Sequence, residues 1–242
     1  MLSCRLSVVK FGGSAITIKS RPETINAEAL EGLSEQVSKY LSAGGRIVIV
    51  HGGGSFGHYA VDRLSRERGR LGPLEVAEVQ RSMLRLSEAV LSSLISKGVP
   101  AVLHPPHTMC DRACNYEPIE RDLREGLAPV TYGDGVLRGG SAVILSGDRL
   151  ASEIATEIGA DCLVFASDVP GVIGPGGVTL KLVRPDSEIA DLGQEGVDVT
   201  GGIRRKLAEA SSSKAKVVRI VHWRDVLRAL MGEDVGTLVL PY

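Results

Sequence analysis

Two glycine-rich segments carry side chains suited to phosphate chemistry. Residues 10–14 read Lys-Phe-Gly-Gly-Ser, and residues 51–58 read His-Gly-Gly-Gly-Ser-Phe-Gly-His. Consecutive glycines let the backbone approach a ligand closely, and their N–H groups can surround an anion. A lysine beside such a turn adds a cation that phosphate oxygens attract. Both segments therefore favour phosphate binding, and Lys19 is near enough in sequence to supply a second charge.

The second segment has two other interpretations. Gly52, Gly54 and Gly57 match G-x-G-x-x-G, the pattern of dinucleotide-binding turns. That interpretation requires a second strand with an acidic end about 20 residues further on, where residues 74–79 instead begin a predicted helix. A plain tight turn would also need small residues, but it gives the flanking serine and histidine no role. The Walker A pattern is absent, which excludes a P-loop kinase.

Two later turns also precede predicted helices. Ser146-Gly147-Asp148 joins a strand to a helix, where Asp148 could serve as an N-cap or as a functional carboxylate. Residues 198–206 read Asp-Val-Thr-Gly-Gly-Ile-Arg-Arg-Lys, a turn that would direct a helix N-terminus at a phosphate. Lysines taken singly are more often solvated surface charges, so the argument depends on the four turns together.

Apolar strands that alternate with amphipathic helices must position these turns. Strands are predicted over 5–9, 46–50, 100–103, 141–145, 161–166, 217–221 and 237–240, and helices over 24–42, 74–97, 148–159, 203–212 and 223–231. Residues 104–125 read as irregular, 129–137 as a hairpin, and 172–183 as a hairpin or flap. The pattern predicts an α/β fold: a three-layer αβα sandwich with an open, mostly parallel central sheet, in which ligands bind at the carboxyl ends of the strands.

Composition narrows the class of protein further. The 242 residues carry a net charge of −1, which gives no electrostatic reason to expect nucleic acid or an acidic membrane as a partner. No apolar run reaches the roughly 20 residues of a membrane-spanning helix. The four scattered cysteines do not indicate a disulfide framework, so a reducing cytoplasm is expected.

Two other groups of residues allow alternative interpretations. His104, His107, Cys110 and Cys114 could suggest zinc, although their spacing matches no usual zinc pattern. The predicted helix over 74–97 carries an apolar stripe: Val76, Val79, Met83 and Leu86. This stripe could line the pocket of an apolar substrate tail, or it could be ordinary core.

The order of the motifs resembles the amino acid kinase superfamily over nearly the whole chain, from Val8 to Leu240. The shared layout is Lys-x-Gly-Gly-Ser, His-Gly-Gly-Gly, Gly-Asp, Ser-Asp-Val-x-Gly-Val and Thr-Gly-Gly-x-x-x-Lys. Lys10 with Ile16-Thr17-x-Lys19, and Gly-Gly-Gly-Ser-Phe-Gly-His, look like the isopentenyl phosphate kinases, and fosfomycin kinases share much of this signature. One departure is Pro170 with Ile173, where relatives commonly have Asp and Tyr in the nucleotide loop.

The resemblance implies a role for each motif. Lys10 and Lys19 would stabilise the transferring phosphoryl group, and Asp148 would orient the lysines. His58 would act on the acceptor phosphate. The acceptor would be bound by Gly53, Gly54, His58 and Gly147, with Met83 of the apolar stripe beside its tail. ATP would be bound by Lys10, Gly12, Gly13, Ser14, Gly54, Asp168, Ile173, Gly177, Gly202 and Lys206.

The resemblance also implies the reaction and its setting. ATP with Mg²⁺ would phosphorylate isopentenyl phosphate to the diphosphate for isoprenoid biosynthesis by the mevalonate route. The alternatives are a kinase of another small phosphate or phosphonate, similar to fosfomycin kinases, and a nucleotide-sensing relative without activity. Residues 1–242 would form one domain, with the acceptor bound by about 1–140 and the nucleotide by 141–242. A cytoplasmic homodimer is expected.

Overall fold

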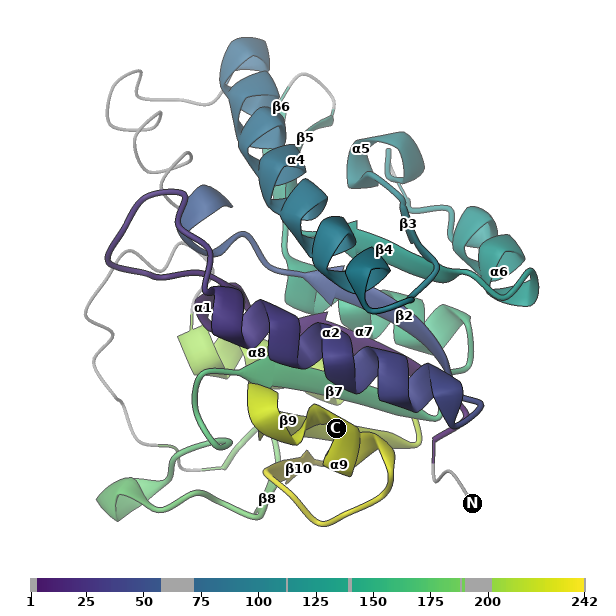
Figure 1. Cartoon of the computed structure of the whole chain (residues 1–242). Helices are drawn as coiled ribbons and strands as arrows, with labels where there is room; N and C mark the ends of the chain where they lie inside the picture. Colours follow the sequence, from purple (N-terminus) through teal and green to yellow (C-terminus); the bar gives the residue numbers. More distant parts are fainter. Residues whose placement is uncertain are drawn as a thin grey trace.

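An open eight-stranded sheet forms the centre of the protein in this computed structural model, which describes residues 4–57, 72–111, 113–138, 141–187, 189 and 202–241. The strand order is β3-β4-β2-β1-β7-β9-β10-β8 (Figure 1). The strands are β1 (Leu6–Phe11), β2 (Arg46–His51), β3 (Ala101–Leu103), β4 (Ala128–Tyr132), β7 (Cys162–Ser167), β8 (Leu182–Val183), β9 (Val217–His222) and β10 (Thr237–Val239). All neighbouring pairs are parallel except β9 with β10.

Helices cover both faces of this sheet. The longer helices on one face are α2 (Ala27–Ser42), α4 (Pro73–Ser96) and α9 (Val226–Leu230), and those on the other are α6 (Glu117–Arg124), α7 (Gly147–Glu157) and α8 (Gly202–Ser212). Figure 1 shows α2 in front of the sheet and α8 behind it. Alternate residues of the central strands enter opposite cores: Val9 and Phe11 face the α2 side, whereas Val8 faces the α7 side. The predicted three-layer αβα sandwich is confirmed.

Local capping explains where the helices begin. Asn26 accepts a hydrogen bond from the Ala29 amide, which places the start of α2 after the predicted residue 24. Pro73 opens α4, and Glu75 Oε2 accepts from the Gly72 amide at 2.8 Å. The N-cap of α7 is Ser146, whose hydroxyl accepts from the Asp148 amide. Asp148 is therefore not the N-cap, and its carboxylate is available for other contacts.

Two predictions about the middle of the chain are wrong. The segment expected to be irregular contains the short helix α5 (Pro106–Met109) and α6. The predicted hairpin over 129–137 does not form, because β4 pairs with β2 and β3 in the main sheet. The hairpin instead joins β5 (Asp134–Arg138) to β6 (Ser141–Leu145). Strand pairing of this kind depends on distant segments, so local turn signals misplace it.

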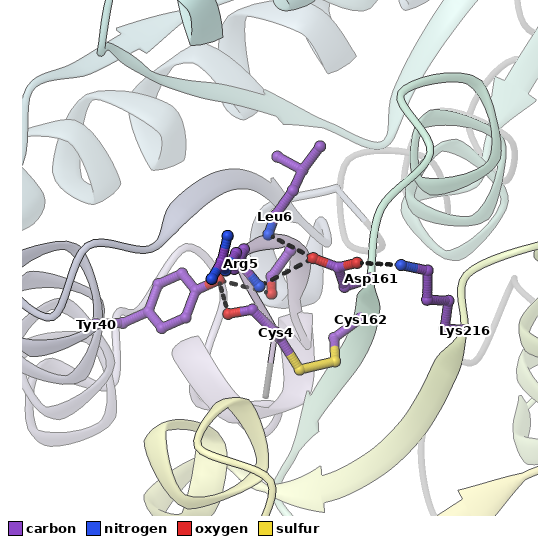
Figure 2. The surroundings of a disulfide bond; sticks show 8 residues. Cys4, Arg5, Leu6, Tyr40, Asp161, Cys162 and Lys216 are labelled. Carbon is purple, nitrogen blue, oxygen red and sulfur yellow. Dashed lines mark hydrogen bonds and ion pairs between the residues drawn. A yellow bond between two sulfur atoms is a disulfide. The ribbon is translucent and has the colours of Figure 1, made fainter. Parts of the chain in front are cut away.

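The cysteines are paired, which corrects the expectation that they do not form a disulfide framework. Cys4 is joined to Cys162, and Cys110 to Cys114. Figure 2 shows the first bond at the amino edge of β1 and β7, where Asp161 accepts from the Arg5 and Leu6 amides at 2.9 and 3.0 Å. The second bond uses two residues of the alternative zinc set, and the described residues hold no group of three metal-ligating side chains. No helix in the described ranges is long and apolar enough to span a bilayer.

Candidate active site

The carboxyl ends of the central strands gather the predicted phosphate-binding turns. β1 ends at Lys10 and Phe11 and lies between β2, which leads into the second glycine turn, and β7, which leads to Asp168. Chain connections leave the sheet in opposite directions on the two sides of β1, and open α/β sheets bind ligands at such a switch point. The local sequence placed each turn after a strand, and the pairing of β1 with both neighbours brings them together.

The two glycine turns touch each other directly. A Cβ on Gly13 would lie 2.3 Å from the Gly54 amide nitrogen, and a Cβ on Gly54 would lie 2.1 Å from Thr17 Oγ1. Gly54 also has a φ of +47°, a conformation that L side chains rarely adopt. Thr17 Oγ1 accepts from the Ser55 amide at 2.9 Å. The glycines therefore permit a backbone-to-backbone contact beside Lys10.

A carboxylate that is largely shielded from solvent bridges two lysines at this point. Lys10 Nζ lies 2.7 Å from Asp148 Oδ1, and Lys206 Nζ lies 3.7 Å from Oδ2. Burial opposes ionisation of Asp148, but the two lysine charges outweigh it and lower its pKa to about 2. Asp148 thus remains charged and fixes two cations at the strand ends. Lys206 was assigned from the resemblance to the nucleotide, and the structure brings it to the same carboxylate as Lys10.

A second carboxylate holds the other predicted lysine. Asp168 Oδ1 accepts from Ser14 Oγ at 2.8 Å, and Lys19 Nζ lies 3.4 Å from Oδ2. Burial acts to raise the pKa of Asp168, but the hydrogen bond from Ser14 and the charge of Lys19 leave it lowered. Lys19 is 60% exposed, whereas the side chain of Lys10 is 8% exposed. Two cationic groups, one buried and one open to solvent, therefore flank the first glycine turn.

Three other residues were predicted to bind the acceptor: Gly147, Met83 and His58. Gly147 lies at the same strand ends, since a Cβ there would be 3.1 Å from the His51 carbonyl and 3.6 Å from Lys10 Cε. Met83 is 1% exposed and packs under the second glycine turn: a Cβ on Gly53 would lie 3.3 Å from its sulfur. Its predicted place beside the acceptor tail stays a prediction. His58 lies outside the described residues.

The remaining nucleotide residues follow β7 or begin α8. Gly12 donates to the Ala166 carbonyl at 2.9 Å, which ties the first turn to β7. Ile173 forms an isolated bridge with Thr179, and Gly177, with a φ of +79°, ends a short 3₁₀ turn between them. Gly202 begins α8 with a φ of +64°. In the part of the chain that the structure describes, no ion pair or hydrogen bond links Ile173, Gly177 or Gly202 to Asp148.

His51 belongs to the glycine motif, but sequence reasoning assigned its side chain no role. Its imidazole is fully buried, lies 2.9 Å from Ser87 Oγ and stacks on Tyr132 with ring centroids 5.3 Å apart. Its position at the end of an apolar strand, directly before three glycines, was the only sequence signal for it.

The fold and the cation-lined glycine turns define a phosphate-transferring class, and comparisons with known proteins agree. The model of the amino acid kinase family matches residues 5–221. The chain therefore belongs to the amino acid kinase family, and its relatives place it with the isopentenyl phosphate kinases of that family.

The relatives cover nearly its whole length. It is 36% identical to the isopentenyl phosphate kinase of Haloferax volcanii, over 97% of this chain and 98% of that protein. It is 28% identical to the isopentenyl phosphate kinase of Methanocaldococcus jannaschii, over 96% and 97%. A solved product complex of Thermoplasma acidophilum isopentenyl phosphate kinase matches with a TM-score of 0.78 and 26% identity, over 96% of this chain and 99% of that one.

Proposed function

We propose that the protein transfers the γ-phosphate of ATP to isopentenyl phosphate and releases isopentenyl diphosphate and ADP. The observation that carries this proposal is the Lys10–Asp148–Lys206 cluster beside two touching glycine turns, in a chain aligned end to end with isopentenyl phosphate kinases. Phosphoryl transfer depends mainly on positioning and on cations around a loose transition state.

The residues at the site support the following roles in phosphoryl transfer. An oxygen of the acceptor phosphate forms a bond to the γ-phosphorus, while the bond from that phosphorus to the β,γ-bridging oxygen breaks and ADP leaves with the electron pair. The acceptor phosphate is already a nucleophile, so no general base is needed. Lys10 and Lys19 stabilise the negative charge on the transferring group, and Asp148 orients Lys10.

The residues that bind the two substrates come from different parts of the chain. Residues up to about 140 supply the glycine loop, His58 and the α4 wall for the acceptor. Residues 141–242 supply Asp168, the segment around Ile173 and Gly177, Gly202 and Lys206 for the nucleotide, while Gly12, Gly13 and Ser14 contact its phosphates. Lys206 has a second role in this proposal, because its contact with Asp148 directs it at the transferring phosphate.

Magnesium would enter with the nucleotide. Both carboxylates at the site are bound to lysines, and the described residues contain no cluster of three metal ligands. This donor set fits an ion held mainly by ATP phosphates, as Mg²⁺ commonly is in kinases. When bound, Mg²⁺ neutralises charge on the phosphates. We also propose that the protein is a homodimer in the cytoplasm and that it serves isoprenoid synthesis by the mevalonate route.

A screen of acceptors tests the reaction. ATP consumption is measured with Mg²⁺ and each of isopentenyl phosphate, dimethylallyl phosphate, longer prenyl phosphates and fosfomycin. We expect the highest kcat/KM with isopentenyl phosphate. Preference for fosfomycin would overturn the proposal in favour of a phosphonate kinase, and binding of ATP without turnover of any acceptor would indicate a nucleotide sensor.

A further inference from the structure

His51 is a buried imidazole with a hydrogen-bond partner at each ring nitrogen. Nδ1 lies 3.2 Å from the carbonyl oxygen of Gly52, the next residue, and Nε2 lies 2.9 Å from Ser87 Oγ on α4. The ring is fully buried. Burial is the main cause that lowers its pKa, to about 4, and the nearby charge of Lys10 acts in the same direction. The imidazole is therefore neutral at physiological pH and carries one N–H.

The partners decide which nitrogen holds that proton. The Gly52 carbonyl oxygen can only accept, so Nδ1 must be the donor if this bond is made. Nε2 then accepts from the Ser87 hydroxyl. The alternative acceptor for Ser87 is the Met83 carbonyl at 2.9 Å, one turn earlier in the same helix. The geometry thus favours the Nδ1–H tautomer.

This bond orients a backbone donor of the second glycine turn. The C=O of Gly52 and the N–H of Gly53 belong to one trans peptide and point in opposite directions. Holding the carbonyl against the imidazole turns the Gly53 amide away from it. Among the described residues this amide meets no acceptor. Glycine on both sides of the peptide would otherwise let it rotate at little steric cost.

Helix α4 fixes the imidazole and the loop together. Besides Ser87, the Ser82 hydroxyl lies 3.2 Å from the Phe56 carbonyl oxygen and 2.8 Å from Glu23 Oε1, and Met83 sulfur packs against Gly53 and Gly57. The same helix contacts β5, where Gln80 donates to the Gly135 carbonyl at 3.0 Å. Helix α4 is therefore tied to the second glycine turn, and the contact between His51 and Ser87 is one of these ties.

We propose that His51 is a positioning residue: its Nδ1–H holds the Gly52 carbonyl so that the Gly53 N–H faces the bound phosphate, and Ser87 holds the ring in that orientation. The assignment of the phosphate rests on the proposed function. The orientation itself does not, because it follows from contacts within the protein.

Nitrogen NMR of the full-length protein labelled with [¹⁵N]histidine tests the orientation directly. We expect the His51 ring to show a protonated Nδ1 and an unprotonated Nε2, unchanged between about pH 6 and pH 8. His51→Asn identifies its signals by their loss. An Nε2–H tautomer, or a ring that titrates in this range, would overturn the proposal whatever the acceptor is.

Two substitutions separate the bonds kinetically. The amide nitrogen of Asn is as many bonds from Cα as Nδ1, whereas that of Gln matches Nε2. His51→Asn can therefore still donate to Gly52, and His51→Gln can reach only Ser87. We expect His51→Gln to lower kcat/KM for the acceptor by roughly 10- to 100-fold, with KM for ATP little changed, and His51→Asn to retain most activity.

Serine variants supply the matched control. Ser87 and Ser34 are both fully buried, and each hydroxyl oxygen lies 2.9 Å from the carbonyl oxygen four residues earlier, but the further partner of Ser34 is Ser93. Ser87→Ala should lower kcat/KM several-fold, and Ser34→Ala should not. Equal losses for Asn and Gln in stably folded proteins would reduce His51 to packing. Failure of the wild type to use isopentenyl phosphate would overturn the proposed function alone, since the NMR result still decides the role of His51.

Discussion

Asp148 and Lys206 meet at the candidate active site, with Lys206 Nζ 3.7 Å from Oδ2 of a carboxylate whose other oxygen binds Lys10 at 2.7 Å. The lysine comes from α8 and the carboxylate from the first turn of α7. One aspartate thus sets the positions of two cations that approach the site from different elements. Kinetics of single and double variants can measure how far the lysines depend on this aspartate.

Asp148→Asn should lower kcat by roughly a hundredfold, or about 3 kcal/mol, because both lysines lose the charge that aligns them. Lys206→Ala should cause a smaller further loss of kcat in the Asp148→Asn background than it causes in the wild type, since the residues act as a unit. Asp161→Asn is a suitable control, because Asp161 pairs with Lys216 at the amino ends of the central strands, away from the candidate site. Additive losses in the double variant would show that Lys206 acts independently of Asp148.

Lys19→Ala should also reduce kcat by about a hundredfold with a smaller change in KM, because its charge would matter most in the transition state. Lys39→Ala is a matched control: both lysines are 60% exposed and both pair with a carboxylate. Steady-state kinetics of the two variants decides the matter. Normal turnover in Lys19→Ala would make Lys19 an ordinary surface lysine.

His58→Ala should raise KM for the acceptor and depress kcat, with KM for ATP little changed. An imidazole N–H can donate to an acceptor phosphate oxygen, and the bond is stronger when the ring is protonated beside that anion. The expected loss in kcat/KM is about 2–3 kcal/mol, and His58→Gln should retain more activity than His58→Ala. Kinetics with each substrate varied in turn tests this; an equal effect on both substrates would remove His58 from the acceptor site.

Asp134→Asn should change how stability depends on pH. Burial raises the pKa of Asp134 to about 7, although its bond from the Gly135 amide acts in the other direction. The folded protein therefore holds this proton more tightly than the unfolded chain does. The resulting stability is present in full below the unfolded pKa, near 4, and is lost as pH rises towards 7.

The neutral amide that Asp134→Asn introduces would not have this pH dependence, while its oxygen could still accept from Gly135. We expect the melting temperature of Asp134→Asn, relative to wild type, to be higher by several degrees at about pH 8 than at about pH 5. Thermal unfolding at both pH values measures the difference. A constant offset would mean that Asp134 stays ionised, for example through His107, whose Nδ1 lies 3.7 Å away.

Reduction of the Cys4–Cys162 bond should lower thermal stability. The bond joins residues 158 positions apart. In the chain-entropy model, closing so long a loop lowers the entropy of the unfolded chain and stabilises the folded protein by about 4–5 kcal/mol. We expect the melting temperature to fall by roughly 10 °C with a reductant, and Cys4→Ala/Cys162→Ala to be low with or without it. Cys110→Ala/Cys114→Ala is the control, because that bond spans four positions. No effect of reductant on the wild type would contradict the bond's role.

Local features of the sequence determined the fold class and the positions of most of the proposed phosphate-binding turns. Apolar periodicity and glycine spacing are properties of short segments, so the strand before Lys10 and the helix after Gly147 could be predicted without knowing what lies beside them. The same reasoning placed the glycine turns at strand ends. The family resemblance assigned Lys206 to the nucleotide, and nothing near that residue in the sequence indicates a partner far away in the chain.

Only the tertiary structure decided which segments meet. The pairing of β1 with both β2 and β7 brings Lys10 to the second glycine turn on one side and Cys4 to Cys162 on the other end of the same strand. The hairpin of β5 with β6, and the bond between His51 and Ser87, likewise join residues through packing. Contacts between distant segments depend on strand order and helix placement, which local propensity does not encode.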